Sequence, residues 1–377
     1  MIKVSKLVLT NFRNFLAKKL EFSDKIILFC GSNGTGKTSI LESLTLFSKG
    51  SSLRGADFDQ MTNQDQNHKK QGFSVYAELL DHEFIENIAI SFDSMTGKKT
   101  TIVNEEATNQ KRQSDLKNHL INFIALTPKL EQLFISSKSG RRDYMDKIVQ
   151  DIDFSHQTRI STYQKLLKER LLILQKYQYS NSDLSNKWLN SIEVKIVENA
   201  VAIAAARNEA VEFFNKAIAN FSSHFPKPKL VAKGDVEELI KEESALALEN
   251  IYKEKLQNNR SQDLARFKTS FGVHRSDFDA IFTKDKKGIS ATLCSTGEQK
   301  AIMIGITLAR AEISAKYRKH PTIMIFDEVV AHLDDDRKNN LLEEIKDSGL
   351  QTFLSATSKD LIPKKSEISI QYIDLSS

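Results

Sequence analysis

The segment Gly31–Thr38 has the residue types and spacing that bind a chain of phosphates. It matches the pattern G-x-x-x-x-G-K-[ST] in full. In this pattern successive backbone N–H groups and the start of the following helix surround β- and γ-phosphate oxygens. Lys37 adds a positive charge, and the Thr38 hydroxyl can ligate Mg²⁺. The segment therefore predicts a nucleoside triphosphate site with the binding residues Gly31, Ser32, Asn33, Gly34, Thr35, Gly36, Lys37 and Thr38.

A second chemical signal lies near the other end of the chain, at Asp327-Glu328. A fully apolar run, Ile323–Phe326, precedes this acidic pair and predicts a buried strand. A carboxylate at the end of such a strand can hold a metal ion through water, and the next one can polarise an attacking water. Ordinary strands also end in this way, so the signal depends on its combination with the phosphate loop. Together they predict that Asp327 supports Mg²⁺ and that Glu328 and Lys37 are catalytic.

The elements around the phosphate loop are predicted from hydrophobic periodicity. The apolar run Ile26–Cys30 predicts a buried strand before the loop, and the periodicity from Lys37 to Lys49 predicts a helix after it. The phosphate loop and the acidic pair are the two half-sites of one nucleotide site. Because both need the same phosphates, the chain must fold back so that its two ends meet. The polar residues 51–72 are expected to form a loop. Residues 2–10 and 16–22 are expected to form paired strands around a turn. Further runs at residues 73–80, 84–92 and 100–103 predict antiparallel strands of a side sheet.

The middle of the chain predicts helices. Apolar residues between Ile160 and Leu174 recur at steps of three and four, which gives one apolar face on a long helix. The run from Trp188 to Phe221 contains no proline or glycine and predicts a second long helix. A further charged helix is expected over Val236–Asn259.

Length and composition agree with a soluble protein of more than one domain. The chain has 377 residues, of which 40% are hydrophobic and 27% charged, and its net charge of +5 is compatible with a polyanionic partner without requiring one. We expect an α/β head formed by residues 1–120 and 265–377, with a mostly helical arm, residues 121–264, inserted between them. The sequence has two cysteines, no signal peptide and no apolar stretch of membrane-spanning length, so a cytoplasmic location without membrane contact is expected.

A third motif, Ser295-Thr296-Gly297-Glu298-Gln299-Lys300, begins a helix that is expected to reach about Tyr317. A helix N-terminus with exposed Ser295 and Gly297 can bind an anion. A plain N-cap, in which Ser295 or Thr296 is followed by an acidic residue, explains the string equally well. Combined with the two half-sites, the string resembles the signature of ABC-type ATPases, which meets the γ-phosphate bound by the opposite subunit. The resemblance implies an ABC-type P-loop ATPase head, with a mixed sheet and an antiparallel side sheet, that carries the inserted α-helical arm.

Longer blocks of the sequence resemble a narrower family, the RecF family of DNA-repair ATPases. The string Gly-x-His-Arg-x-Asp and the Arg141-Arg142 pair separate RecF from transporter ATPases and from the long coiled-coil relatives. The blocks occur in the family's order over essentially the whole chain. Besides the motifs above they are Asn11-Phe12-Arg13-Asn14-Phe15, Thr127-Pro128, Ser139–Asp146, Gly272–Phe278 and Ala331-His332-Leu333-Asp334.

The RecF resemblance implies an ATP-dependent homodimer that binds DNA at single-strand gaps or at junctions of double- and single-stranded DNA. Such a protein works with RecO and RecR to help load RecA in recombinational repair, in replication restart and in the SOS response to DNA damage. The resemblance also implies weak, DNA-stimulated ATP hydrolysis that acts as a conformational switch, with ATP and Mg²⁺ as cofactors. The alternative class is a nucleotide-gated scaffold or regulatory module that does not bind DNA directly.

Some charged residues keep two interpretations. The resemblance implies that Arg13 contacts the nucleotide, but an ordinary turn arginine fits the same pattern. Arg141 and Arg142 are expected either at DNA or in salt bridges, and His274 in a structural or interface role. Runs of basic residues are usually solvated. If several of them lie on one side of a dimer, they would form a surface that contacts the phosphates of the DNA backbone. These runs are Lys69-Lys70, Lys98-Lys99, Lys227–Lys233 and Lys364-Lys365.

The chain departs from larger ABC-type ATPases at two places. Those proteins carry a histidine after the strand that follows the catalytic glutamate, whereas Leu350–Asp360 contains none. Only Ser355, Thr357 and Ser358 could supply a polar group there, so we expect slow hydrolysis, which suits a switch. In the signature, Thr296 and Glu298 replace a glycine and a glutamine.

Overall fold

The structure is a computed structural model, and it describes residues 3–48, 53–64, 71–81, 84–104, 106–107, 121–176, 183–284, 287–317, 321–361 and 368–376. The chain forms two compact units, Met1–Glu131 with Thr307–Ser377, and Gln132–Ile306. The division into head and arm at residues 120 and 265 stays a prediction about the chain's organisation. Within the described ranges, no helix combines the length and the apolar composition needed to cross a bilayer.

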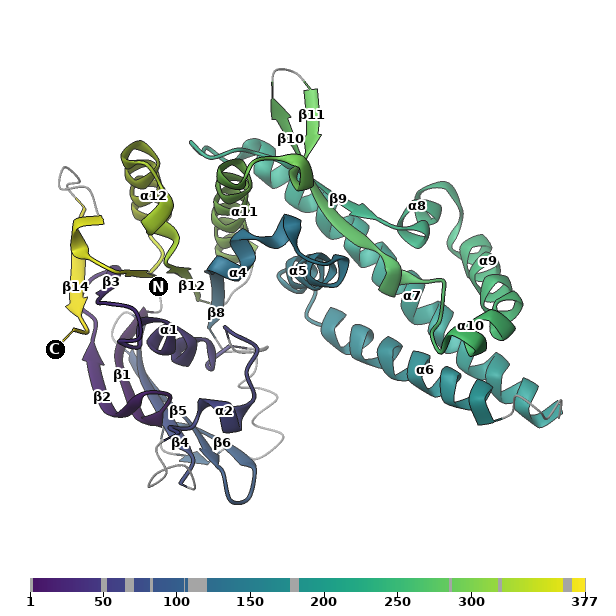
Figure 1. The fold of residues 1–377 in the computed structure, drawn as a ribbon, viewed down its shortest axis with the longest axis horizontal. Coiled ribbons are helices and arrows are strands. Elements are labelled where there is room, and N and C mark those ends of the chain that lie inside the picture. The colour runs from purple at the N-terminus through teal and green to yellow at the C-terminus, as the bar shows by residue number, and fades with distance from the viewer. Residues whose placement is uncertain are drawn as a thin grey trace. The chain divides into compact units, whose positions relative to one another are not determined.

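The first unit contains a five-stranded sheet with the order β14-β3-β13-β12-β8 (Figure 1). Every pairing in it is parallel. Parallel strands end at the same edge of a sheet, so the residues that follow them gather there. The strands are β3 (Ile26–Cys30), β8 (Asn122–Leu126), β12 (Thr322–Asp327), β13 (Thr352–Ala356) and β14 (Ile370–Asp374). The helices of this unit include α1 (Lys37–Thr45), α2 (Phe58–Met61), α4 (Pro128–Glu131) and α12 (Asp335–Ser348).

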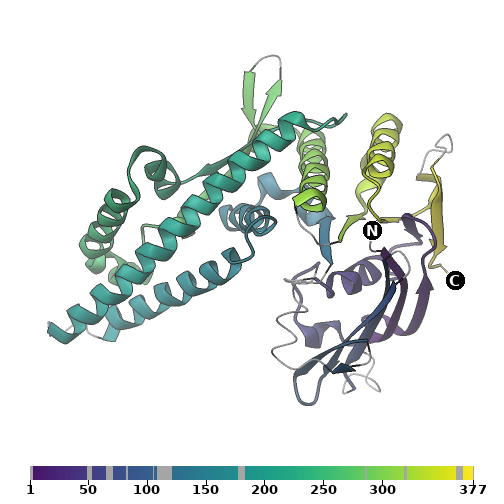
Figure 2. The ribbon, with the colours of Figure 1, turned by 180° about the vertical axis from the view of Figure 1, so that it is seen from behind.

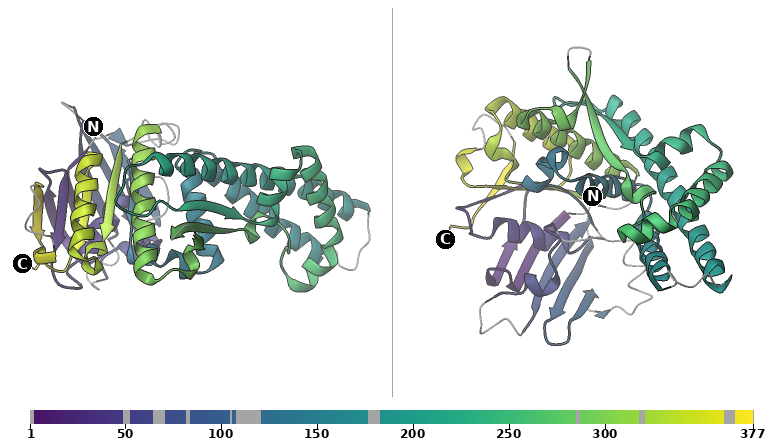
Figure 3. Two further views of the ribbon diagram at one scale, coloured as in Figure 1. Left: turned by 90° about the horizontal axis from the view of Figure 1, so that it is seen from above. Right: turned by 45° about the vertical axis from the view of Figure 1, so that its right-hand side comes forward.

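The predicted side sheet is present as a six-stranded antiparallel sheet with the order β2-β1-β4-β5-β6-β7. Figure 3 shows the purple strands of this sheet beside the blue ones. One apolar core joins the two sheets, since Phe22 packs edge-on against Phe353 of β13 with ring centroids 5.0 Å apart. The strands are β1 (Lys3–Phe12), β2 (Phe15–Glu21), β4 (Phe73–Asp81), β5 (Phe84–Asp93), β6 (Lys98–Val103) and β7 (Glu106–Ala107).

The second unit is mainly helical, as the periodicity predicts. Its longest helix, α7 (Asp183–Asn220), packs against α6 (His156–Lys176), and Figure 2 shows the two running side by side. Three strands that the sequence interpretation missed form a small antiparallel sheet. These strands are β9 (Lys229–Lys233), β10 (Asp277–Lys284) and β11 (Lys287–Ser290). The other helices are α5 (Lys138–Gln150), α8 (Asp235–Glu242), α9 (Ala245–Asn258), α10 (Arg260–Arg266) and α11 (Thr296–Tyr317). The last residues of α11 belong to the first unit.

Two local predictions were wrong. The single helix expected over Val236–Asn259 is divided into α8 and α9. Ser244 has extended backbone angles, and its hydroxyl accepts a hydrogen bond from the Ala247 N–H, which makes it the N-cap of a new helix. The polar segment 51–72, expected to be a loop throughout, contains the short helix α2.

Candidate functional site

The phosphate loop lies between β3 and α1, so strand, loop and helix follow one another as the motif requires. Gly36 precedes the first residue of α1 with φ 100°, a left-handed conformation that favours glycine. A Cβ at this position would lie 2.4 Å from the Phe15 ring. Only glycine therefore allows the loop to turn into the helix at this point.

Lys37 is folded back across its own loop. Its Nζ donates hydrogen bonds to the carbonyl oxygens of Gly31, at 2.6 Å, and Ser32, at 2.8 Å. The Thr35 hydroxyl donates to the Ser32 carbonyl as well. The lysine is buried. These contacts hold the ammonium group within the loop, where a phosphate chain would neutralise it.

The acidic pair reaches the loop from the opposite end of the chain. Thr38 Oγ1 donates a hydrogen bond of 3.1 Å to Oδ1 of Asp327, the last residue of β12. Burial raises the pKa of Asp327, against the opposing hydrogen bonds from Ser355 and Thr38. The structure thus brings the predicted metal residues Thr38 and Asp327 together. A hydroxyl and a carboxylate are the hard oxygen donors that Mg²⁺ prefers, so this pair fits the ion.

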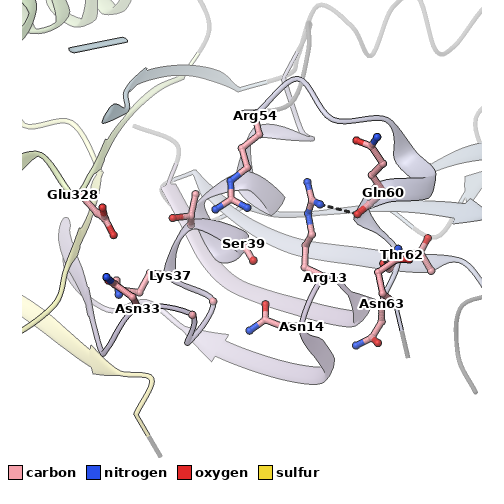
Figure 4. Close-up of a pocket in the computed structure, with 14 residues that line it drawn as sticks. Arg13, Asn14, Asn33, Lys37, Ser39, Arg54, Gln60, Thr62, Asn63 and Glu328 are labelled. Atoms are coloured by element: carbon pink, nitrogen blue, oxygen red, sulfur yellow. Dashed lines mark hydrogen bonds between the residues drawn. The ribbon is translucent and has the colours of Figure 1, made fainter. Parts of the chain in front are cut away.

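A cavity of about 690 Å³ opens beside the loop. In Figure 4, Glu328 lies on the same side as Asn33 and Lys37, and Gln60, Thr62 and Asn63 lie on the opposite side. Polar and charged side chains dominate its wall, as suits a charged ligand. The lining residues are Arg13, Asn14, Asn33, Gly34, Gly36, Lys37, Thr38, Ser39, Arg54, Gln60, Thr62, Asn63, Gln64 and Glu328.

Arg13 has internal contacts at the turn and also lines the cavity, and its contact with the nucleotide stays a prediction. Its guanidinium forms an ion pair with the fully buried Glu42, at 2.7 Å, and donates to the Gln60 carbonyl, also at 2.7 Å. The backbone of Arg13 is left-handed, with φ 53°. These contacts make it a structural residue of the turn and also hold it in the cavity wall.

Several lining residues were not among the predicted site residues. Arg54 and the segment 60–64 reach the cavity from the stretch that the sequence presents as an unpatterned polar loop. Their approach depends on pairing with the β1–β2 turn, because Arg13 N–H donates to the Met61 carbonyl and Asn63 N–H to the Asn11 carbonyl. A lone arginine in a polar segment carries no periodicity or motif, so no sequence signal marks these residues.

Glu328 directly follows β12 and faces the cavity. Its backbone is left-handed, with φ 58°, an unusual conformation for a residue other than glycine. Its N–H donates a hydrogen bond of 2.9 Å to Ser355 Oγ. Glu328 is therefore held at a sharp turn at the edge where the parallel strands end.

The signature segment, in the second unit, forms the reciprocal cap that was its alternative interpretation. The Ser295 hydroxyl and backbone N–H both donate to Glu298 Oε2 at 2.9 Å, and the Glu298 N–H donates to Ser295 Oγ at 3.4 Å. This is a capping box at the start of α11. A Cβ on Gly297 would meet no atom within 4 Å, so packing within the chain does not require glycine there.

The other charged candidates have internal contacts. Arg141 binds both carboxylate oxygens of Asp277, at 2.8 Å each, and Arg142 donates to the Ser276 carbonyl. His274 is hydrogen-bonded to the Tyr163 hydroxyl and the Thr269 carbonyl. These contacts support the structural interpretations. Of the basic runs, Lys98-Lys99 lies on β6 and Lys227–Lys233 includes β9, whereas Lys69-Lys70 and Lys364-Lys365 lie outside the described residues.

Comparison with known proteins gives one consistent family. The family described as RecF/RecN/SMC N terminal domain matches residues 3–373. The DNA replication and repair protein RecF of Rickettsia bellii (strain OSU 85-389) is 34% identical over 356 residues, which cover 94% of each chain. RecF of Rickettsia canadensis (strain McKiel) is 34% identical over 361 residues, which cover 96% of each.

The fold comparison agrees with the sequence comparison. The recombination mediator protein RecF of the RecFOR pathway, solved with ATPrS, superposes with a TM-score of 0.81 at 22% identity, over 100% of this chain and 97% of that one. A structure of the recombination mediator protein RecF with ATP gives a TM-score of 0.79 at 23% identity, over 100% of this chain and 98% of that one. The expected fold class, an ABC-type ATPase head with helical additions, is confirmed. With two sheets, the phosphate loop and the acidic pair in place, the chain belongs to the RecF family.

Proposed function

We propose that this protein is an ATP-dependent DNA-binding switch of recombinational repair and replication restart. The single observation that carries the nucleotide part is the hydrogen bond between Thr38 and Asp327 at the edge of a polar cavity. Two motifs from opposite ends of the chain meet there, and each supplies what the other lacks for binding a magnesium-bound triphosphate.

Different residues of the head bind the phosphates of ATP, hold the metal ion and activate water. The backbone N–H groups of the loop and the Lys37 ammonium bind the β- and γ-phosphates, and Lys37 leaves its loop carbonyls to do so. Thr38 and Asp327 would hold Mg²⁺, which would neutralise charge on the phosphate oxygens. Glu328 faces the cavity, where it orients the attacking water and accepts a proton from it. Hydrolysis is weak because Leu350–Asp360 contains no histidine, and a slow rate suits a switch.

The second half of each site comes from another copy of the chain. Ser295 and Gly297 of the partner contact the γ-phosphate, and the steric freedom at Gly297 supports this role. ATP closes the homodimer because its γ-phosphate contacts both surfaces, and hydrolysis reopens it. ADP lacks the bridging group and does not suffice.

The names of the relatives support the DNA part of the proposal. The curated relatives are DNA replication and repair proteins, and the solved one is a recombination mediator of the RecFOR pathway. We propose that the closed dimer binds DNA at single-strand gaps or at double-strand/single-strand junctions in the cytoplasm. It then works with RecR- and RecO-type mediators to promote RecA loading, and DNA stimulates its ATPase activity.

The test compares ATP turnover and sedimentation with and without gapped DNA over a range of salt concentrations. The proposal expects DNA-stimulated turnover, an ATP-dependent dimer and an affinity for DNA that falls steeply with salt. ATP-dependent dimerisation with indifference to DNA would instead support the nucleotide-gated scaffold. A protein that neither binds ATP nor dimerises would overturn both functions.

A further inference from the structure

Ser355 is hydrogen-bonded to both acidic residues of the site. It belongs to β13, which stands between β3 and β12. In the parallel register Ser355 is paired with Asp327. Its side chain is completely buried. A buried serine in the middle of an apolar sheet requires hydrogen-bond partners, so its contacts are informative.

The Ser355 hydroxyl makes two hydrogen bonds with fixed directions. It donates a hydrogen bond of 2.7 Å to Asp327 Oδ1, because a carboxylate oxygen can only accept. It accepts the Glu328 N–H, at 2.9 Å, on a lone pair. One hydroxyl thus connects two consecutive residues, the proposed metal carboxylate and the proposed base.

The second hydrogen bond acts on strained backbone. Glu328 has left-handed angles and precedes η4 (Val329–His332), a 3-10 helix. Its N–H stands before that helix, so the helix provides it with no acceptor. Strained residues persist only where their surroundings hold them. The Ser355 hydroxyl supplies that restraint from the neighbouring strand.

We propose that Ser355 is a positioning residue for ATP hydrolysis. It holds the Glu328 turn so that the carboxylate faces the cavity, and it directs Asp327 towards Thr38. This role rests on the proposed ATPase function. The phosphate contacts of Lys37 and the loop do not involve Ser355, so loss of its hydroxyl lowers turnover and leaves ATP binding intact.

The first experiment needs neither nucleotide nor metal. Hydrogen exchange is measured on peptides that contain the Glu328 amide, in the wild type and in Ser355→Ala. The variant is expected to exchange faster at this amide, since its acceptor is gone. Thr352→Val is the matched control, because it removes another buried hydroxyl of β13, which donates to the Leu350 carbonyl. Unchanged exchange at Glu328 in Ser355→Ala overturns the proposal.

The second experiment separates turnover from binding. Ser355→Ala is expected to lower kcat by about 10- to 100-fold, the scale of a misplaced catalytic group, with ATP affinity within about 3-fold of the wild type. Ser355→Thr keeps the hydroxyl and is expected to restore most of the turnover. Equal loss of turnover in Ser355→Thr and Ser355→Ala, or a loss of ATP affinity as large as that of kcat, overturns the positioning role. If Ser355→Ala does not fold, Ser355→Cys takes its place with the same expectations.

A double variant tests whether Ser355 acts through Glu328. In a Glu328→Gln background, Ser355→Ala is expected to have little further effect on turnover, because the group that it positions is absent. Full additivity overturns the proposed action of Ser355 through Glu328. The outcome is separable from the proposed function: a wild type without ATP turnover refutes the ATPase, whereas an active wild type matched by Ser355→Ala refutes only the role of Ser355.

Discussion

Thr38 and Asp327 stand 289 positions apart in the chain, and their side chains share a hydrogen bond of 3.1 Å. Thr38 follows the phosphate-loop lysine, and Asp327 ends β12. β13 separates β3 from β12 in the sheet, so all three strands must pair in register for the two residues to meet. The nucleotide site therefore exists only when the first unit is folded.

Glu328→Gln is expected to bind ATP and to lose at least about 100-fold in turnover, because the amide cannot accept the proton of the attacking water. The unhydrolysed nucleotide should trap a closed dimer, measured by sedimentation with ATP. Glu343→Gln, an exposed position on α12, makes the same chemical change away from the site. Wild-type turnover in Glu328→Gln would remove Glu328 from the catalytic role.

Lys37→Ala is expected to lose nucleotide binding together with ATP-enhanced retention on DNA, since the charge that neutralises the phosphates is gone. Fluorescent ATP binding and DNA retention are measured on the same sample. The exposed Lys25 serves as a control, changed to alanine in the same way. ATP affinity near that of the wild type would contradict the proposed phosphate contact.

Ser295→Arg is expected to leave ATP binding by the monomer intact and to prevent the ATP-dependent dimer, because the bulky cation occupies the surface that should meet the partner's γ-phosphate. ATP titration and sedimentation report the two properties separately. Ser261→Arg places the same side chain at an exposed position of α10. Loss of ATP affinity in the monomer would show that Ser295 does not act across a subunit interface.

Arg170→Ala is expected to reduce the free energy of unfolding of the second unit by about 3–5 kcal/mol, the usual effect of breaking a buried ion pair on one side. Arg170 is fully buried and joins α6 to Glu193 of α7, at 2.9 Å, and Asp263 of α10, at 2.7 Å. Its loss removes the Arg170 cation from Asp263, whereas Glu193 keeps its ion pair with Arg260. Urea unfolding measures the change, and Lys168→Ala, exposed on the same helix, should be nearly neutral.

His274 is expected to make stability depend on pH. Burial lowers its pKa, against the opposing hydrogen bond to Thr269, and the charges of Arg275 and Arg142 lower it further. The folded protein thus keeps a neutral ring that accepts from Tyr163 while the unfolded chain takes up a proton at about pH 6.5. The contribution of His274 to the free energy of unfolding is fully present above that pH. It is lost as the pH falls through the lower pKa that His274 has in the folded protein.

The measurement is the urea midpoint at about pH 7.5 and about pH 5.5, on either side of the ordinary histidine pKa. His274→Gln should show a smaller decrease than the wild type. His224→Gln, an exposed histidine of the same unit, should behave like the wild type. The same decrease in all three proteins would show that His274 does not cause the pH dependence.

The sequence by itself determined the local parts of the site. The loop at Gly31–Thr38 is recognisable because its glycines and its lysine act through neighbouring backbone groups, and the strand before Asp327 because a buried parallel strand is apolar throughout. The long helices α6 and α7 follow from periodicity for the same reason. In each case the interactions lie within a few residues along the chain, so the pattern and its cause occupy the same segment.

Only the tertiary structure decided which distant residues complete those parts. Ser355, Thr357 and Ser358 are the polar residues where larger ABC-type ATPases carry a histidine, and only the register of Ser355 opposite Asp327 shows which groups it binds. Arg54 and Gln60 line the cavity, and Ser244 divides a helix that periodicity presents as continuous. Strand register, burial and the approach of a second segment arise from long-range packing, and a single stretch of sequence does not contain them.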